Sequence, residues 1–173
     1  MVSVAGPTAE AEFDGFVAAR SAALFRTAVL LCGGDHAAAA DAVQDTMLEV
    51  WRRWRRIRVM ERADGYAYRI LVTQVLRCRR RNLRLVVTDD PPELPPAASV
   101  AADERHDLMA QLRRLPPMQR AVIVLRYYED LSEAQTAHLL DISAGTVKSH
   151  TSRALAALRT RLPQTYATGG GHD

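Results

Sequence analysis

The sequence is poor in lysine, cysteine and aromatic residues, and it has no long apolar run. Lys148 is the only lysine among 23 basic residues, so arginine supplies nearly all of the positive charge. Aromatic residues make up 6% of the chain and hydrophobic residues 48%, so we expect a core of Ala, Leu and Val, which favours helices. No apolar run approaches the roughly 20 residues of a membrane span, so we expect no membrane insertion.

Signatures of catalysis, metal binding and export are also missing. Cys32 and Cys78 lie far apart in no metal-ligand spacing, and we expect both to be small buried apolar residues. No Ser/His/Asp or Cys/His pattern is present, which favours a protein that is not an enzyme and needs no metal, cofactor or small-molecule substrate. The N-terminal residues lack the basic and apolar segments of a signal peptide, so we expect a cytoplasmic protein.

A proline-rich stretch divides the chain. Residues 86–102 read VVTDDPPELPPAASVAA, and four prolines within six residues cannot continue a helix. We therefore predict an all-α fold of two small helical domains joined by a Pro-rich linker. The expected divisions are a domain at 10–85, a flexible acidic linker at 86–103, a second domain at 104–163 and a disordered tail at 164–173.

Apolar residues at helical spacing predict three helices before the linker. The first ends at Gly33-Gly34, and the second begins after Asp35, which is placed as an N-cap. We expect Trp51 and Trp54 on the apolar face of that second helix. The three expected ranges are 13–32, 35–54, and from Asp64 into the arginine cluster at 77–84.

After the linker, we expect helices over 103–115 and 118–128, separated by Pro116-Pro117. Residues 132–162 then predict a helix, a tight turn at Asp141-Ile142 and a second helix capped by Ser143, which is a helix-turn-helix. Its second helix has a buried stripe at Val147, Thr151, Ala154, Leu155, Leu158 and Leu162. Periodicity alone favours DNA binding and an ordinary solvated helix face equally, and the two arginine clusters, at 52–62 and 77–84, favour DNA.

Three segments together resemble a group 4, or extracytoplasmic-function, sigma factor of bacterial RNA polymerase, of the actinobacterial SigE-like kind. DHAAAADAVQDTMLEVWRRW resembles sigma regions 2.1–2.2, and DGYAYRILVTQVLRCRRR resembles regions 2.3–2.4. LPPMQRAVIVLRYYEDLS and TVKSHTSRALAALR resemble the lead-in and recognition helix of region 4. The matching segments are residues 35–54, 64–81 and 112–162.

The resemblance implies partners and contact residues. The expected partners are the β′ and β subunits of core RNA polymerase, promoter DNA and an anti-sigma factor. The residues implied to bind the β′ coiled coil are Asp41, Gln44, Asp45 and Glu49. Those implied to meet the −10 element are Tyr66, Arg69, Gln74, Arg77, Arg79 and Arg80. Those implied to meet the −35 element are Thr146, Lys148, Ser149, His150, Ser152 and Arg153.

Several roles stay open in this interpretation. Tyr66 and Tyr68 either stack on bases or belong to the core. Arg120 and Arg126 either contact DNA backbone or the polymerase flap, or make internal contacts. Within the helix-turn-helix, Thr136 replaces the usual Ile and Asp141 the usual Gly, although Asp tolerates a left-handed backbone.

Two other classes of protein share parts of this pattern. A LuxR-type regulator has a similar recognition helix, but residues 10–85 show no period-2 strand for its usual effector domain. A pure interaction adaptor without DNA contact is disfavoured by the arginine clusters.

Overall fold

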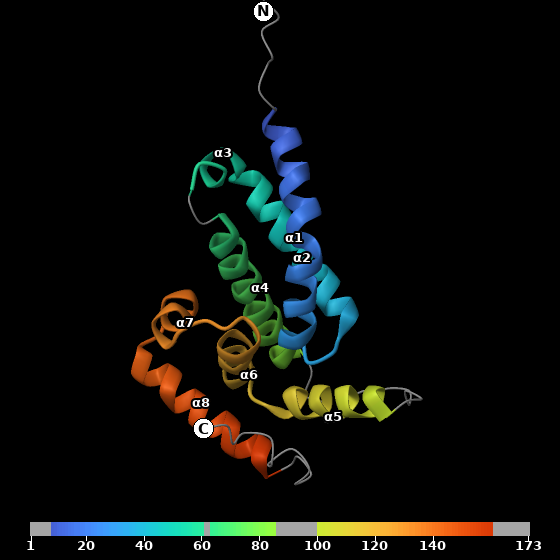
Figure 1. The fold of residues 1–173 in the computed structure, drawn as a ribbon, viewed down its shortest axis with the longest axis vertical. Helices are drawn as coiled ribbons and strands as arrows, with labels where there is room; N and C mark the ends of the chain where they lie inside the picture. Colours follow the sequence, from blue (N-terminus) through green and yellow to red (C-terminus); the bar gives the residue numbers. More distant parts are fainter. Residues whose placement is uncertain (1–7, 61–62, 86–99, 161–173) are drawn as a thin grey trace, which may run out of the picture.

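The computed structural model describes residues 8–60, 63–85 and 100–160, and it describes side chains for these except at 78–85 and 100–106. All regular elements in these ranges are helices, as the predicted all-α class requires (Figure 1). They are α1 (Ala9–Leu31), α2 (His36–Arg52), α3 (Trp54–Ile57), α4 (Ala63–Leu85), α5 (Val100–Arg114), α6 (Pro117–Ile123), the π-helix η1 (Val124–Tyr128), α7 (Glu133–Leu140) and α8 (Ala144–Arg159).

Helix ends before the linker follow the local sequence signals. The α1–α2 turn contains Gly33 and Gly34 at φ values of 66° and 88°, a left-handed conformation that suits glycine. The Asp35 side chain accepts a hydrogen bond from the Ala38 amide at 2.9 Å and caps α2. The predicted turn and cap are therefore confirmed, while Arg53 interrupts the predicted helix at 35–54 and α3 follows it.

We call α1–α4 the upstream bundle. Its core is built from buried side chains of α1, α2, α3 and α4, including Leu24, Val50 and Leu71. Phe13 of α1 packs on the α2–α3 junction, with its ring centroid 4.8 Å from that of Trp51 and 5.3 Å from that of Trp54. Trp54 is buried, but Trp51 is 42% exposed, so its prediction as an inward residue is wrong. Trp51 lies at the edge of the apolar stripe, where α1 covers it only partly.

We call α5–α8 the downstream bundle, and it differs from prediction in one helix. The expected helix at 118–128 divides into α6 and η1. The Glu129 amide donates to the Val124 carbonyl at 3.1 Å, which is the five-residue step of a π-helix. This wider turn shifts the side chains that follow Val124 around the helix axis.

The helix-turn-helix forms as its sequence predicts. Asp141 ends α7 at φ 56°, and Ser143 accepts a hydrogen bond from the Thr146 amide at 3.1 Å to cap α8. A capping box of Ser132 and Gln135 starts α7, a signal that the sequence interpretation missed. Val147, Ala154 and Leu158 are buried as expected, and Leu162 lies outside the described residues.

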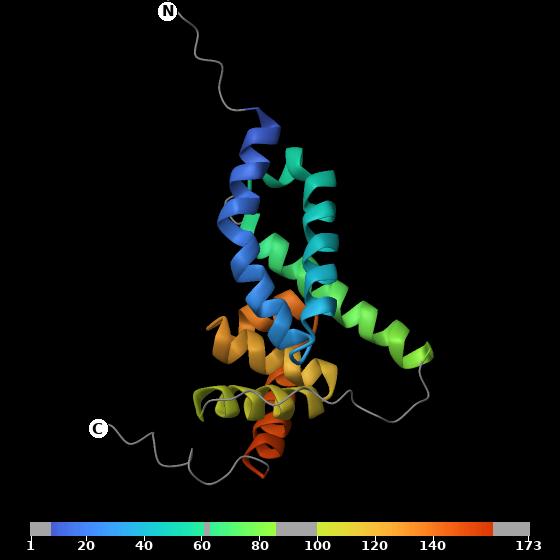
Figure 2. The same cartoon turned by 90° about the vertical axis from the view of Figure 1, so that its right-hand side faces the viewer.

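The two bundles pack against each other. Ala121, Val124 and Leu125 of the downstream bundle belong to the same buried cluster as Leu24 and Leu71 of the upstream bundle. Helix α4 contacts both α6 and α7, which lie beside it in Figure 1, and Figures 1 and 2 show α5 below α1. Most of the predicted linker and all of the predicted tail at 164–173 lie outside the described residues, so the domain boundaries remain predictions.

Candidate partner and nucleic-acid interfaces

An acidic face runs along α2. Asp41, Gln44 and Asp45 are exposed, and their spacing places them on one side of the helix. Glu49, one turn further on, is half-buried and pairs with Arg53 and, at 3.5 Å, with Arg52. Asp41, Gln44 and Asp45 therefore present an exposed polar surface. Much of the negative charge of Glu49 is offset by its two arginine partners.

Two apolar side chains extend this acidic face. The sequence interpretation did not predict that they would be exposed. Leu48 is 47% exposed and Trp51 is 42% exposed. With Gln44 they line a shallow cavity of about 490 Å³ between α1 and α2. Their i, i+4, i+7 spacing places residues 44, 48 and 51 on one face of the helix, and this pattern could have predicted that Leu48 and Trp51 lie beside Gln44. The face thus combines carboxylates with an apolar strip, which suits a partner helix bearing basic and aliphatic side chains.

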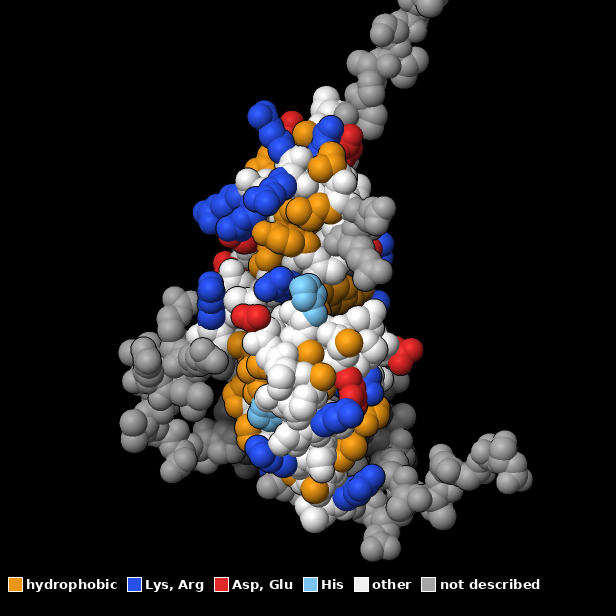
Figure 3. All heavy atoms as spheres, turned by 90° about the vertical axis from the view of Figure 1, so that its left-hand side faces the viewer, with side chains coloured by type: hydrophobic (Ala, Val, Ile, Leu, Met, Phe, Trp, Pro, Cys, Tyr) orange, Lys and Arg blue, Asp and Glu red, His pale blue; other side chains and the backbone are white. Residues whose placement is uncertain are grey.

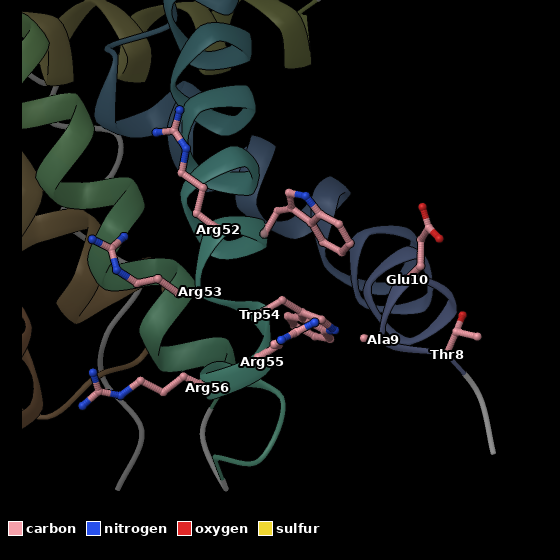
Figure 4. Close-up of a pocket in the computed structure, with 9 residues that line it drawn as sticks. Thr8, Ala9, Glu10, Arg52, Arg53, Trp54, Arg55 and Arg56 are labelled. Atoms are coloured by element: carbon pink, nitrogen blue, oxygen red, sulfur yellow. The ribbon is translucent and has the colours of Figure 1, made fainter.

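A second cavity, of about 670 Å³, lies between the start of α1 and the α2–α3 junction. Figure 4 shows Arg52, Arg53 and Arg56 pointing away from Thr8 and Glu10, so these guanidinium groups do not gather around a common centre. The indole nitrogen of Trp54 is buried without a hydrogen-bond partner among the described residues. The cavity therefore has no cluster of donors that would select an anion.

Basic side chains are concentrated near α3. Figure 3 shows Lys and Arg side chains gathered at the upper end of one face, beside exposed apolar side chains. Arg58 pairs with Glu12 at 2.9 Å, while Arg55 and Arg56 have no ion-pair partner in the described part of the chain. The exposed arginines from this run are Arg52, Arg53, Arg55, Arg56 and Arg58. Such a surface attracts phosphates through long-range charge.

Five of the six predicted −10 positions share one face of α4, and position 79 falls on another side of the helix. Positions 66, 69, 74, 77 and 80 fall within about half a turn of each other at 100° per residue. Arg69 and Arg77 are exposed, while Tyr66 and Gln74 are half-buried. Arg79 and Arg80 lie within α4, but their side chains are outside the described set.

Tyr68 lies on another side of α4 and is tied to the downstream bundle. Its hydroxyl group hydrogen-bonds with Thr27 and Glu129. Burial raises the pKa of the Tyr68 phenol above 10.0, and the negative charge of Glu129 raises it further. Of the two readings that the sequence left open, the structure shows Tyr68 as part of a packed contact between the bundles.

The recognition helix α8 presents its predicted residues unevenly. Ser152 and Arg153 are exposed, and Lys148 is exposed with a long ion pair to Glu133 at 3.7 Å. The other three predicted residues, Thr146, Ser149 and His150, are half-buried. The Thr146 hydroxyl lies 2.8 Å from the Ser143 hydroxyl, and the buried His150 Nδ1 has no partner among the described residues.

The two arginines of uncertain role make internal contacts. Arg120 is fully buried and donates to the carbonyls of Leu112 at 3.2 Å and Arg113 at 3.4 Å. Arg126 is half-buried and donates to the Leu131 carbonyl. Both side chains therefore stabilise the downstream bundle, because they hydrogen-bond backbone carbonyls within it.

The described residues hold neither a metal-binding cluster nor a membrane-spanning helix. No group of three or more His, Cys, Asp or Glu side chains in those ranges is placed to hold a metal ion. None of the helices there is long and apolar enough to cross a bilayer.

The fold and these faces define a two-part, all-helical DNA-binding protein with a helix-turn-helix in its downstream part. Residues 16–85 match Sigma-70 region 2 and residues 105–158 match Sigma-70, region 4. The chain is 40% identical over 153 residues to the RNA polymerase sigma-E factor of Streptomyces coelicolor, covering 87% of this chain and 86% of that protein. The chain belongs to the sigma-70 family of RNA polymerase sigma factors, within its extracytoplasmic-function group.

Other relatives agree with this membership. The ECF RNA polymerase sigma factor SigL of Mycobacterium tuberculosis is 36% identical over 155 residues, which cover 86% of this chain and 87% of SigL. Among solved structures, the sigma factor RpoE of Bartonella quintana, crystallised with the anti-sigma factor NepR, has a TM-score of 0.71 at 25% identity. That match covers 86% of this chain and 95% of RpoE.

Proposed function

We propose that the exposed face of α2 binds core RNA polymerase through Asp41, Gln44 and Asp45, with Leu48 and Trp51 as apolar contacts. The observation that carries this assignment is the combination of three exposed polar residues and two exposed apolar residues on one helix face. Buried apolar anchors contribute most of the energy of an interface, and rim charges mainly fix its orientation. Glu49 contributes less, because Arg52 and Arg53 already pair with it.

Two further helix faces act on promoter DNA in this proposal. The face of α4 that carries Arg69 and Arg77 meets the −10 element, where Tyr66 is placed to stack on an unpaired base. The exposed residues of α8, Lys148, Ser152 and Arg153, meet the −35 element in the major groove. His150 is half-buried with its Nδ1 enclosed, so it would meet DNA through its Nε2 edge.

The remaining parts of the proposed function concern control and chemistry. Catalysis belongs to the polymerase, and this chain contributes binding energy alone. An anti-sigma factor is a proposed regulator, supported by the complex that the similar RpoE of Bartonella quintana forms with NepR. The proposed site of action is the cytoplasm, where the polymerase works.

Run-off transcription tests the proposal. Core polymerase from an actinobacterium, with this protein and fragmented genomic DNA, is expected to give new start sites preceded by shared −35 and −10 sequences. Asp45→Arg is expected to weaken core binding at least tenfold, because it places a cation against a basic partner surface. Asp107→Arg, at an exposed position on α5 outside the proposed faces, is the matched charge control. The α2 assignment fails if both variants bind core equally well.

A further inference from the structure

The two helices of the helix-turn-helix are fixed relative to each other by a small buried cluster. Helices α7 and α8 lie against each other (Figure 1). Ala137 of α7 and Val147 of α8 pack together with Val122 of α6. The capping box of Ser132 and Gln135 fixes the first turn of α7, with hydrogen bonds of 2.8 and 3.1 Å. Packing and capping, rather than surface charge, therefore set where the first residues of α7 lie relative to α8.

An ion pair joins the two helices at their surface. Glu133, the first residue of α7, lies one turn before Ala137, and Lys148 directly follows Val147. The Glu133 Oε2 and Lys148 Nζ atoms lie 3.7 Å apart. Because this distance is longer than a hydrogen bond, the carboxylate attracts the ammonium group while its N–H donors remain available for another acceptor.

This ion pair leaves Lys148 able to read a base. Lys148 is the fifth residue of α8, and the N-terminal residues of a recognition helix are those that reach base edges. Its ammonium group is a compact point charge with three donors, and guanine offers the acceptors O6 and N7 in the major groove. The Glu133 carboxylate can therefore stay close to Lys148 while Lys148 donates to a base.

The same ion pair opposes contact with phosphates. The first helix of a helix-turn-helix crosses the DNA backbone, so the side of Lys148 that faces α7 is the side nearest to phosphates. Glu133 lies on that side and carries a negative charge of its own. To follow a phosphate, Lys148 must leave this carboxylate, and the ion pair gained is offset by the ion pair lost. Binding to unrelated DNA therefore gains little from Lys148.

We propose that Glu133 is a specificity-determining residue for promoter recognition: it holds Lys148 towards a base edge of the −35 element and keeps it from the phosphates of unrelated DNA. This inference deepens the proposed function of α8 and rests on it. A charge that disfavours the wrong partner more than the right one increases selectivity. Glu133 acts through Lys148 and need not touch DNA, so it is a positioning residue.

Binding of the full chain to two short duplexes at several salt concentrations tests this inference. One duplex carries the shared −35 sequence found by run-off transcription, and the other carries the same bases in scrambled order. We expect Glu133→Gln to bind the scrambled duplex about two- to fivefold more tightly, the strength of an exposed ion pair, and the −35 duplex nearly as the wild-type chain does. The slope of log affinity against log salt should steepen by about 1 on the scrambled duplex alone.

Two matched variants assign the effect. In a Lys148→Ala background, Glu133→Gln should no longer change the ratio of the two affinities, because Glu133 acts through Lys148. Glu10→Gln removes a carboxylate from the first turn of α1, far from α8 in Figure 1, and should leave that ratio unchanged. Glu133 also stabilises the start of α7 through the helix dipole, but loss of that role alone would lower the urea midpoint and leave the ratio as it is.

Nuclear magnetic resonance observes Lys148 directly. Because the chain has one lysine, lysine-selective isotope labelling gives one lysine side-chain signal. In the wild-type chain, we expect the −35 duplex to shift this signal and the scrambled duplex to leave it nearly unchanged. In Glu133→Gln, both duplexes should shift it. Without DNA, the signal should differ between Glu133→Gln and wild type and be the same in Glu10→Gln and wild type.

The outcomes separate this inference from the proposed function. An unchanged affinity ratio in Glu133→Gln, a changed ratio in the Lys148→Ala background, or one lysine signal common to free wild type and Glu133→Gln would overturn the inference. Equal affinity of the wild-type chain for the two duplexes would overturn the proposed −35 recognition together with it. A wild-type preference for the −35 duplex that Glu133→Gln retains in full would overturn this inference alone.

Discussion

Replacement of Thr136 by valine is expected to stabilise the protein. Thr136 is fully buried in α7, and its hydroxyl has no hydrogen-bond partner among the described residues. A buried polar group without a partner costs about 1–3 kcal/mol, and valine has nearly the same shape and helix propensity as threonine. We therefore expect Thr136→Val to raise the free energy of unfolding by about 1–2 kcal/mol.

Urea denaturation followed by circular dichroism measures this change. With an m value of about 2 kcal/mol/M, the midpoint should rise by about 0.5–1 M at unchanged m. In a thermal scan, the same gain corresponds to about 2–8 °C for a chain of this size. An unchanged or lower midpoint would show that the Thr136 hydroxyl is satisfied in solution and would refute the reasoning.

Thr46→Val is the matched control, because it makes the same chemical change at another buried helical position. Thr46 is also fully buried, but its hydroxyl donates to the Ala42 carbonyl at 2.7 Å. Loss of that hydrogen bond should lower the free energy of unfolding by about 0.5–1.5 kcal/mol. Opposite signs at the two positions would assign the effect to hydrogen bonding rather than to the added methyl group.

Four other outcomes are expected. Leu125→Ala should cost about 2–5 kcal/mol in urea unfolding, because it opens a cavity in the core shared by both bundles. Asp141→Val should cost about 1–2 kcal/mol at its φ of 56°, with Asp141→Asn near neutral in the same assay. Lys148→Ala should reduce the slope of log affinity against log salt by about 1 on a promoter fragment, if Lys148 meets a phosphate. Burial and Glu129 raise the pKa of Tyr68 in the folded protein, so its contribution is complete below pH 10.0 and is lost as pH rises through the folded pKa. Tyr68→Phe should therefore weaken the loss of stability as pH rises above 10.0, followed by circular dichroism.

The helix-turn-helix and most helix ends could be predicted from the sequence, because short-range contacts decide them. The Ser143 cap bonds an amide three residues away, and the Asp35 cap does the same. Gly33, Gly34 and Asp141 adopt left-handed backbone conformations that their residue types tolerate. The exposed polar face of α2 likewise follows from helical periodicity alone.

Other parts of the candidate site could not be predicted, because neighbouring helices decide which side of an apolar stripe is covered. Trp51 belongs to the stripe of α2, yet the position of α1 leaves it 42% exposed and so adds it to the face that we propose binds polymerase. Arg120 is a surface residue by its chemistry, and only the packing of the downstream bundle makes it fully buried.

The sequence by itself determined the family, the helices and the polar faces, because motifs and caps depend on residues within a few positions of each other. The tertiary structure alone decided that the two bundles share a core and that Tyr68 is bound within it. Thr27 and Glu129 are 102 residues apart, and no periodic pattern relates positions so distant. Their contact depends on how complete helices pack, and that packing selects which surfaces of this sigma factor remain free.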